Sequence, residues 1–214
     1  MDYLRNYLET VNKIAAAIDL SQVEKMIDIL RDLRNEGGRL FFLGVGGSAA
    51  NCSHAVNDFR KIVGIEAYTP VDNVSELTAR TNDEGWESVF SAWLRVSRLS
   101  AKDAIMIFSV GGGDRERNIS PNLVSALELA VERKSKILGI VGRQGGYTAK
   151  VADACVIIPT IREDMITPQA EAWQGVIWHM LVSDPRLSQS SAKWESVSRT
   201  KVTTSSPSVA AATP

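Results

Sequence analysis

Short apolar runs divide the chain, and most of them end at glycine or proline. The strongest occupy residues 40–45, 104–109 and 137–141, and weaker ones occupy residues 65–69 and 156–159. Continuous apolar runs of this length, bounded by turn-forming residues, are typical of strands buried on both faces. The pattern therefore predicts five strands.

Between these runs, apolar residues recur at steps of three and four, which predicts amphipathic helices. Residues 4–18 carry one narrow apolar stripe, close in spacing to a coiled-coil seam. A second helix is predicted from a capping box of Ser21 and Glu24 to a stop at Gly37. Further helices are predicted over residues 48–62, in two pieces of 72–99, from residue 120, and from residue 167 to about 183.

Alternation of strands and helices predicts an α/β fold with a parallel sheet covered on both faces. Residues 1–184 are expected to form this single domain, and residues 1–36 its N-terminal helices. From residue 185 to 214 the composition shifts to Ser, Thr, Ala and Pro, which predicts a flexible tail.

Composition places the 214-residue chain among ordinary globular proteins, with 44% apolar and 23% charged residues. A formal net charge of -1 gives no reason to expect a nucleic-acid or membrane surface. The sequence has no apolar stretch long enough to span a bilayer and no signal-peptide pattern at its start. A cytoplasmic location is therefore expected.

The segment from residue 39 to 59 carries the first candidate chemistry. A predicted strand leads through Gly46, Gly47 and Ser48 into a predicted helix. This arrangement directs free backbone N–H groups and the positive end of a helix dipole at one point, which favours an anion.

The chain has only two histidines, and each has an acidic residue at helical spacing. His54 and Asp58 are four residues apart, and Glu171 and His179 are eight apart. If the two helices meet, four groups suited to a divalent metal or to proton transfer converge. The alternatives are a surface His–Asp pair, a glutamate placed by the helix dipole, and a histidine satisfied in the core.

The glycine-rich stretch at residues 109–122 is the second candidate. Backbone N–H groups at 111–113 and the hydroxyls of Ser109 and Ser120 can cradle a phosphate. Arg115 and Arg117 could close over it as bidentate donors. The alternative is a surface loop with ordinary charges. No GxGxxG or Walker pattern names a nucleotide.

Several stretches together resemble one known family. GVGGSAANCSHAVNDF, DNVSELTARTNDEGWESVF, the second glycine loop, IVGRQGGYTAKVADACVIIP and the last predicted helix are similar to the sugar isomerase (SIS) domain family. The likeness is to its phosphoheptose isomerase branch and extends, in order, over residues 3–183. It implies a three-layer αβα sandwich with a five-stranded parallel sheet, and a homotetramer with active sites between subunits.

The resemblance also implies an activity in carbohydrate metabolism and heptose biosynthesis. The branch converts sedoheptulose 7-phosphate to D-glycero-D-manno-heptose 7-phosphate through an enediol, assisted by zinc. Carried over by position, His54, Asp58, Glu171 and His179 hold the metal, and Asp58 and His179 are catalytic. The resemblance implies that Ser48, Asp83, Ser109 and Ser120 bind the substrate or its phosphate. The two glycine turns and the loop arginines add Gly47, Gly111, Gly112, Arg115 and Arg117 as further candidates.

The sequence departs from the branch at three places. Asp58 is one methylene shorter than the glutamate of the family, and Glu171 replaces a glutamine, which adds a negative charge. Gly111 replaces a serine of the phosphate loop, which also carries an insertion with two arginines. Two other functions stay open: a non-catalytic SIS module that binds a phosphosugar or a protein, and an isomerase of a different phosphorylated sugar.

Overall fold

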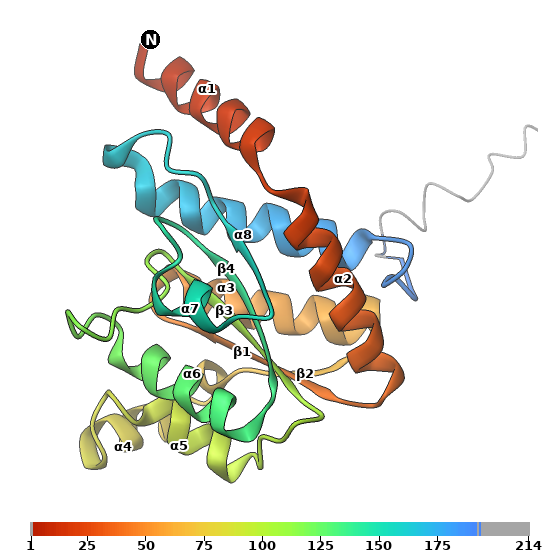
Figure 1. The fold of residues 1–214 in the computed structure, drawn as a ribbon, viewed down its shortest axis with the longest axis vertical. Helices are drawn as coiled ribbons and strands as arrows, with labels where there is room; N and C mark the ends of the chain where they lie inside the picture. The colour runs from red at the N-terminus through yellow and green to blue at the C-terminus, as the bar shows by residue number, and fades with distance from the viewer. Residues whose placement is uncertain (1, 192, 194–214) are drawn as a thin grey trace, which may run out of the picture.

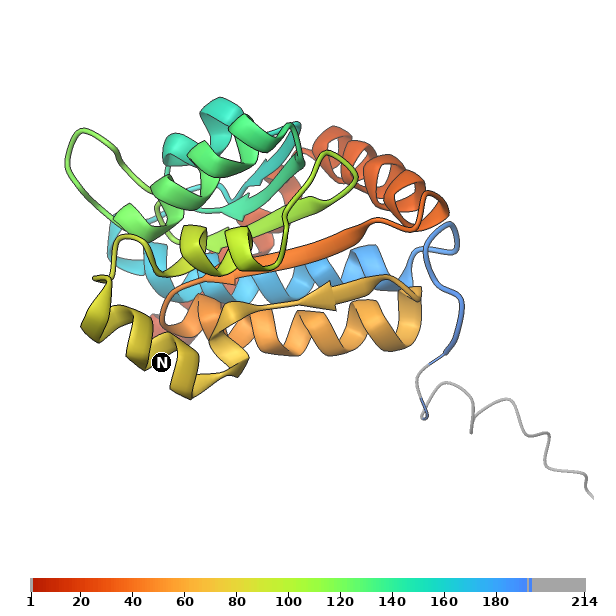
Figure 2. The same ribbon diagram turned by 90° about the horizontal axis from the view of Figure 1, so that it is seen from below.

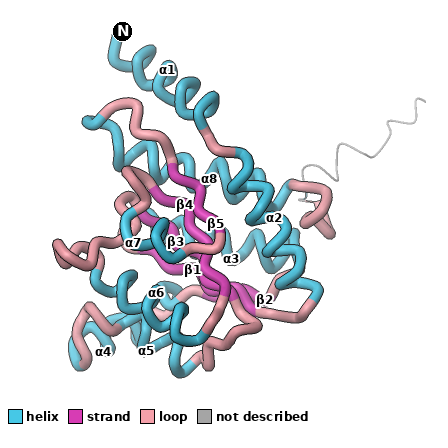
Figure 3. Tube along the Cα trace, in the orientation of Figure 1, coloured by secondary structure: helices cyan, strands magenta, loops and turns pink. Residues whose placement is uncertain are grey.

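The computed structural model of the chain describes residues 2–191 and residue 193. Its centre is a five-stranded sheet in the order β2-β1-β3-β4-β5, in which all neighbouring strands are parallel (Figures 1 and 3). The strands are β1 (Arg39–Gly44), β2 (Glu66–Tyr68), β3 (Ala104–Ser109), β4 (Lys136–Val141) and β5 (Ala154–Ile157). The predicted α/β class and the five-stranded parallel sheet are confirmed.

Helices cover both faces of the sheet, which explains why its strands are continuous apolar runs. Phe42 and Met106 face the layer formed by α2 (Leu20–Asn35), α3 (Gly47–Asp58) and α8 (Ile166–Ser183). Phe41 and Ile105, one position earlier on the same strands, face the opposite layer. That layer contains α5 (Val89–Val96), α6 (Pro121–Arg133) and α7 (Gly146–Val151), with α4 (Val74–Asp83) beside α5. The result is a three-layer αβα sandwich.

Asp103 holds the starts of β1 and β3 together. Its carboxylate accepts hydrogen bonds from the backbone N–H and the guanidinium of Arg39, and from Ser100. Burial alone would raise the pKa of Asp103, but these hydrogen bonds outweigh it and lower that pKa below its usual value. These contacts tie the first residue of β1 to the residue that precedes β3, where the two strands begin to pair.

The N-terminal helices differ in how they pack. In α2, the predicted apolar face of Val23, Met26, Ile27, Leu30 and Leu33 is buried. The predicted capping box is wrong, because the side chain of Asp19 accepts the hydrogen bond from Ser21 N and caps the helix. By contrast, α1 (Asp2–Ala17) buries only Thr10 and Ile14 and extends away from the sandwich (Figure 1).

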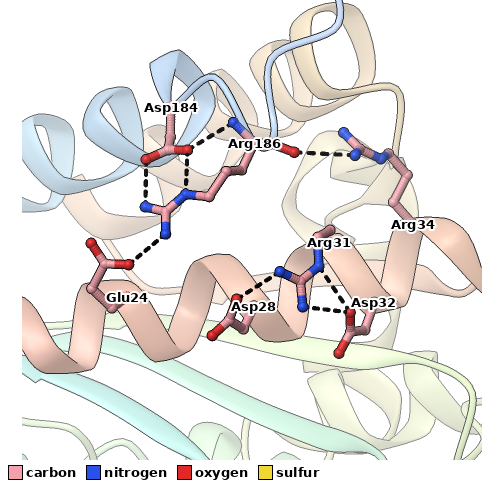
Figure 4. Close-up of polar contacts among 7 residues, drawn as sticks. All are labelled: Glu24, Asp28, Arg31, Asp32, Arg34, Asp184 and Arg186. Carbon is pink, nitrogen blue, oxygen red and sulfur yellow. Dashed lines mark hydrogen bonds and ion pairs between the residues drawn. The ribbon is translucent and has the colours of Figure 1, made fainter.

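The chain beyond α8 continues to pack on the domain. Arg186 pairs with Asp184 and with Glu24 of α2, and its backbone carbonyl accepts from Arg34 Nη2 at 3.2 Å (Figure 4). Arg34 Nη1 also donates to Leu187 O, at 2.6 Å. Leu187 is fully buried. The packed part of the chain therefore extends past residue 185, where we expected the tail to begin, and residues 192 and 194–214 of that segment lie outside the described residues. No described helix has the length and apolar content to cross a bilayer.

Candidate functional site

The turn between β1 and α3 places the N-terminus of α3 at the carboxyl end of the sheet. Gly46 adopts φ +64°, a conformation that glycine reaches without strain, and the helix begins at the next residue. In a parallel α/β sheet, this edge is where ligands bind. The predicted strand, glycine turn and helix are therefore confirmed at the place where an anion would be expected.

Helices α3 and α8 lie side by side and run in the same direction (Figure 2). Near their N-termini, Asn51 of α3 contacts Glu171 and Gln174 of α8. Further along, Asp58 of α3 contacts Trp178 and His179 of α8. The two helices therefore meet at two levels. The first level contains Asn51, Glu171 and Gln174, and the second contains Asp58, Trp178 and His179.

At the second level, the only two histidines of the chain converge on one carboxylate. His54 Nε2 and His179 Nε2 each lie 3.4 Å from Asp58 Oδ2, and the two imidazole centroids are 5.4 Å apart. The imidazoles are about half exposed, at 56% and 53%, whereas the Asp58 side chain is only 10% exposed. A molecule approaching from solvent therefore meets the imidazoles first, with the carboxylate beneath them.

Two neighbouring side chains hold the Asp58 carboxylate in place. Trp178 Nε1 donates to Oδ2 at 3.1 Å, and Asn57 Nδ2 donates to Oδ1 at 3.1 Å. The indole of Trp178 is buried and stacks on Phe108 of β3, with centroids 5.8 Å apart. The chain then leaves α3 through a π-helical turn, η1 (Phe59–Val63), a feature often found at functional sites.

The donor set at this level fits a divalent metal ion. One ligand atom from each of His54, Asp58 and His179 lies within 4.8 Å of the other two. Two imidazole nitrogens and a carboxylate oxygen form one of the ligand sets that zinc uses in catalytic sites. The geometry is therefore compatible with a metal site open to solvent on the imidazole side.

Glu171, the fourth predicted ligand, does not join this cluster. Its carboxylate lies over the N-terminus of α3, where a Cβ added to Gly47 would be 2.6 Å from Glu171 Oε2. It belongs to the first level of the α3–α8 contact, about two helical turns before His179. The structure brings three of the four predicted ligands together and places Glu171 next to the glycine turn.

A pocket of about 400 Å³ opens between the two glycine turns. Of the residues predicted to bind phosphate, six line it: Ser48, Ser109, Gly111, Gly113, Arg117 and Ser120. Arg143 and Asp114 line it as well, and Arg117 Nε is 3.8 Å from Asp114 Oδ2. Two guanidinium groups and one carboxylate give this pocket a positive balance, which favours an anion.

The second glycine turn has a defined internal structure. Ser109 Oγ accepts hydrogen bonds from the backbone N–H groups of Gly111 and Gly112, at 3.3 and 3.0 Å. Gly112 adopts φ +73°, its carbonyl accepts from Thr148 Oγ1, and a Cβ there would overlap the carbonyl oxygen of Gly145. These two amides are therefore used within the loop, and the hydroxyl of Ser109, which lines the pocket, remains able to donate to a ligand there.

The remaining predicted residues lie elsewhere. Arg115 is 71% exposed, pairs with Glu128 at 3.4 Å and does not line the pocket. Asp83 is exposed at the end of α4, where it accepts from Asn82 Nδ2. In the described part of a single chain, neither Arg115 nor Asp83 lies at the histidine cluster or lines the pocket.

Sequence reasoning missed three residues that shape the site. Arg143 lies two residues after the end of β4, so the rule for ligands at strand ends could have identified it. Trp178 and Gln174 carry no comparable signal, because their roles depend on which face of α8 meets α3.

The fold and site together define a parallel α/β protein with an anion pocket at the strand ends and a histidine–carboxylate cluster between two helices. Residues 2–142 match the model of the SIS domain family. The chain belongs to this family and to its phosphoheptose isomerase branch, a branch of phosphosugar isomerases.

Two relatives and one solved structure are similar to this chain. The chain is 36% identical over 162 residues to a probable phosphoheptose isomerase of Thermoplasma volcanium, covering 72% of this chain and 78% of the relative. It is 29% identical over 188 residues to the lincomycin biosynthesis protein LmbN of Streptomyces lincolnensis, covering 83% of this chain and 66% of that protein. The structure of phosphoheptose isomerase GmhA from Neisseria gonorrhoeae superposes with a TM-score of 0.72 at 22% identity, covering 85% and 93% of the two chains, and supports the fold.

Proposed function

We propose that this protein is an aldose–ketose isomerase that converts sedoheptulose 7-phosphate to D-glycero-D-manno-heptose 7-phosphate through an enediol. The observation that carries the proposal is the meeting of His54 and His179 at the Asp58 carboxylate, on helices far apart in sequence. Proton transfer between neighbouring carbons needs a base and an acid held close together. The family assignment supports the same reaction class.

His54, Asp58 and His179 are proposed to hold a divalent metal ion, with zinc as the first candidate. When bound, the ion polarises the substrate carbonyl and stabilises negative charge on its oxygen. Glu171 stays our candidate for a fourth ligand, which requires its side chain to turn away from Gly47.

Asp58 is proposed as the base and His179 as the acid. Asp58 removes a proton from C1 of the ketose, the C–H electrons form the C1=C2 bond, and His179 protonates the oxygen on C2. His179, which has given up its proton, then takes the proton of the C1 hydroxyl, and the protonated Asp58 returns its proton to C2, which gives the aldose. Because Asp58 lies beneath the two imidazoles, the reacting carbons must enter between them.

The pocket at the glycine turns is proposed to bind the phosphate, through Ser48, Ser109, Ser120 and Arg117. Ser48 and His54 are six residues apart on α3, which corresponds to about 9 Å along the helix axis. An extended seven-carbon sugar phosphate is of comparable length. This spacing supports a substrate whose phosphate and carbonyl lie at opposite ends.

Gly112→Ala is expected to weaken binding of inorganic phosphate at least about tenfold, because the added methyl overlaps Gly145 O and φ is positive. Isothermal titration measures the dissociation constant. Gly37→Ala is the matched control, since Gly37 also has φ +68° but open space around it, far from the pocket. Unchanged phosphate affinity in the Gly112 variant would contradict the assignment of this pocket.

A homotetramer in the cytoplasm is also proposed, with active sites completed between subunits. Tyr3, Leu4 and Leu8 of α1 are between 63% and 69% exposed, an apolar surface suited to another copy. Asp83 and Arg115 are proposed to contact substrate in that assembly, together with Gly47. Light scattering is expected to give the mass of four chains, and the mass of a single chain would contradict the tetramer.

Metal analysis followed by an assay on sedoheptulose 7-phosphate tests the proposal. The expected result is bound metal and formation of the aldose. Metal without turnover of this sugar would favour an isomerase of a different phosphorylated sugar. The observation that favours this alternative is that Arg117 and Arg143 line the pocket. Neither metal nor turnover would favour a non-catalytic SIS module.

A further inference from the structure

A chain of three side-chain amide and hydroxyl groups links α8 to the first glycine turn. Asn51 Nδ2 donates to the backbone carbonyl of Glu171 at 3.0 Å and to Gln174 Oε1 at 2.8 Å. Gln174 Nε2 in turn donates to Ser48 Oγ at 3.0 Å. Gln174 is fully buried, and Ser48 is 1% exposed.

The donor and the acceptor of each of these hydrogen bonds follow from the first one, between Asn51 and the backbone carbonyl of Glu171. A backbone carbonyl can only accept, so the Asn51 atom facing Glu171 O must be the amide nitrogen. That nitrogen also faces Gln174, so the Gln174 atom there must be the oxygen. The other end of the Gln174 amide is then a nitrogen, which can only donate, and Ser48 Oγ must accept from it.

This polarity determines what Ser48 can do. Its hydroxyl proton has no acceptor among the described residues, and the side chain lines the pocket at the glycine turns. Ser109 is in the same condition, because its Oγ accepts from the N–H groups of Gly111 and Gly112. Both serines therefore present O–H donors to one pocket. The Ser109 hydroxyl is oriented by backbone N–H groups of its own loop, whereas the Ser48 hydroxyl is oriented by Gln174 of α8.

We propose that Gln174 is a positioning residue that holds Ser48 as a hydrogen-bond donor to the phosphate of the substrate. The inference rests on the proposed function, in which this pocket binds the phosphate. A phosphate dianion offers only acceptors, so a hydroxyl already committed to donate binds it without reorienting. Gln174 thereby selects a phosphate monoester over ligands that would need Ser48 to accept.

Gln174→Met tests this role, because methionine fills a similar volume but leaves Ser48 free to rotate. Inorganic phosphate is the probe, and its dissociation constant is measured by isothermal titration in the wild type, Gln174→Met, Ser48→Ala and the double variant. Gln169→Met is the matched control: Gln169 is buried on the same helix, but its side-chain amide has no partner within the described residues. Thermal unfolding checks that each variant is folded.

We expect Gln174→Met to weaken phosphate binding about three- to tenfold, Ser48→Ala about tenfold or more, and Gln169→Met less than about twofold. Because Gln174 acts through Ser48, the double variant should bind no more weakly than Ser48→Ala alone. With the substrate, KM should rise more than kcat falls.

Two outcomes overturn the inference in distinguishable ways. If the wild type binds phosphate and Gln174→Met binds it equally well, or if the two substitutions weaken binding additively, Gln174 does not position Ser48. If the wild type binds no phosphate at millimolar concentration, the proposed phosphate pocket fails, and the inference fails with it. If Gln174→Met does not fold, Gln174→Glu is measured instead. There the carboxylate accepts the Ser48 proton and repels the anion, so phosphate affinity should fall further than in Ser48→Ala.

Discussion

His179→Ala is expected to lower turnover of sedoheptulose 7-phosphate by about a thousandfold or more. The substitution removes the proposed acid and one of three clustered metal-binding groups at once. It should leave the fold intact, because the His179 side chain is 53% exposed and its removal opens no cavity in the core. Steady-state kinetics with a metal-content measurement on the same sample checks both effects.

Met180→Ala is the control for this substitution. Met180 is the next residue on α8 and is 40% exposed, so its removal should change turnover less than about twofold. Near-normal activity of the His179 variant, with the substrate supplied at saturation, would contradict the proposed mechanism.

Asp58→Asn is expected to have a comparable effect on turnover and a larger one on metal affinity. Asparagine keeps the size of the side chain but loses the negative charge that the two imidazoles approach. We expect kcat to fall about a thousandfold and zinc to bind at least about a hundredfold more weakly. Competition with a chromogenic chelator measures the affinity.

Asp72→Asn is the matched control for that experiment. Asp72 is exposed and its carboxylate accepts from Ser53 Oγ of α3, one residue before His54, but it is not part of the histidine cluster. It should change zinc affinity less than about twofold. If the two variants lose zinc affinity equally, the loss comes from removing a negative charge near the surface and not from removing a ligand of the metal.

The strands and the inner helix faces were predictable because they depend on local patterns. The six residues of β3 are all buried, and its bounds match the predicted run at 104–109. The i,i+4 relation of His54 and Asp58 likewise follows from helix geometry alone. Their meeting with His179 required the family resemblance, since no periodicity states which helices pack together.

The remaining differences arise from one competing local contact and from tertiary contacts. Asp19 caps α2 although Ser21 and Glu24 had the better local signature. Glu171 had the right spacing from His179, but its carboxylate lies over Gly47. The side-chain hydrogen bond of Gln174 depends on two partners on another helix. The Asp19 cap is a local contact that competed with the Ser21–Glu24 signature. The positions of Glu171 and Gln174 were decided by contacts between α8 and α3, which a single sequence does not contain.

Anomalous diffraction from crystals of the zinc-loaded protein, collected at the zinc edge, tests the central claim most directly. We expect one zinc peak per chain between α3 and α8, within bonding distance of both imidazoles and the Asp58 carboxylate. A zinc ion bound elsewhere, or crystals of an active enzyme in which these three side chains hold no metal, would contradict it.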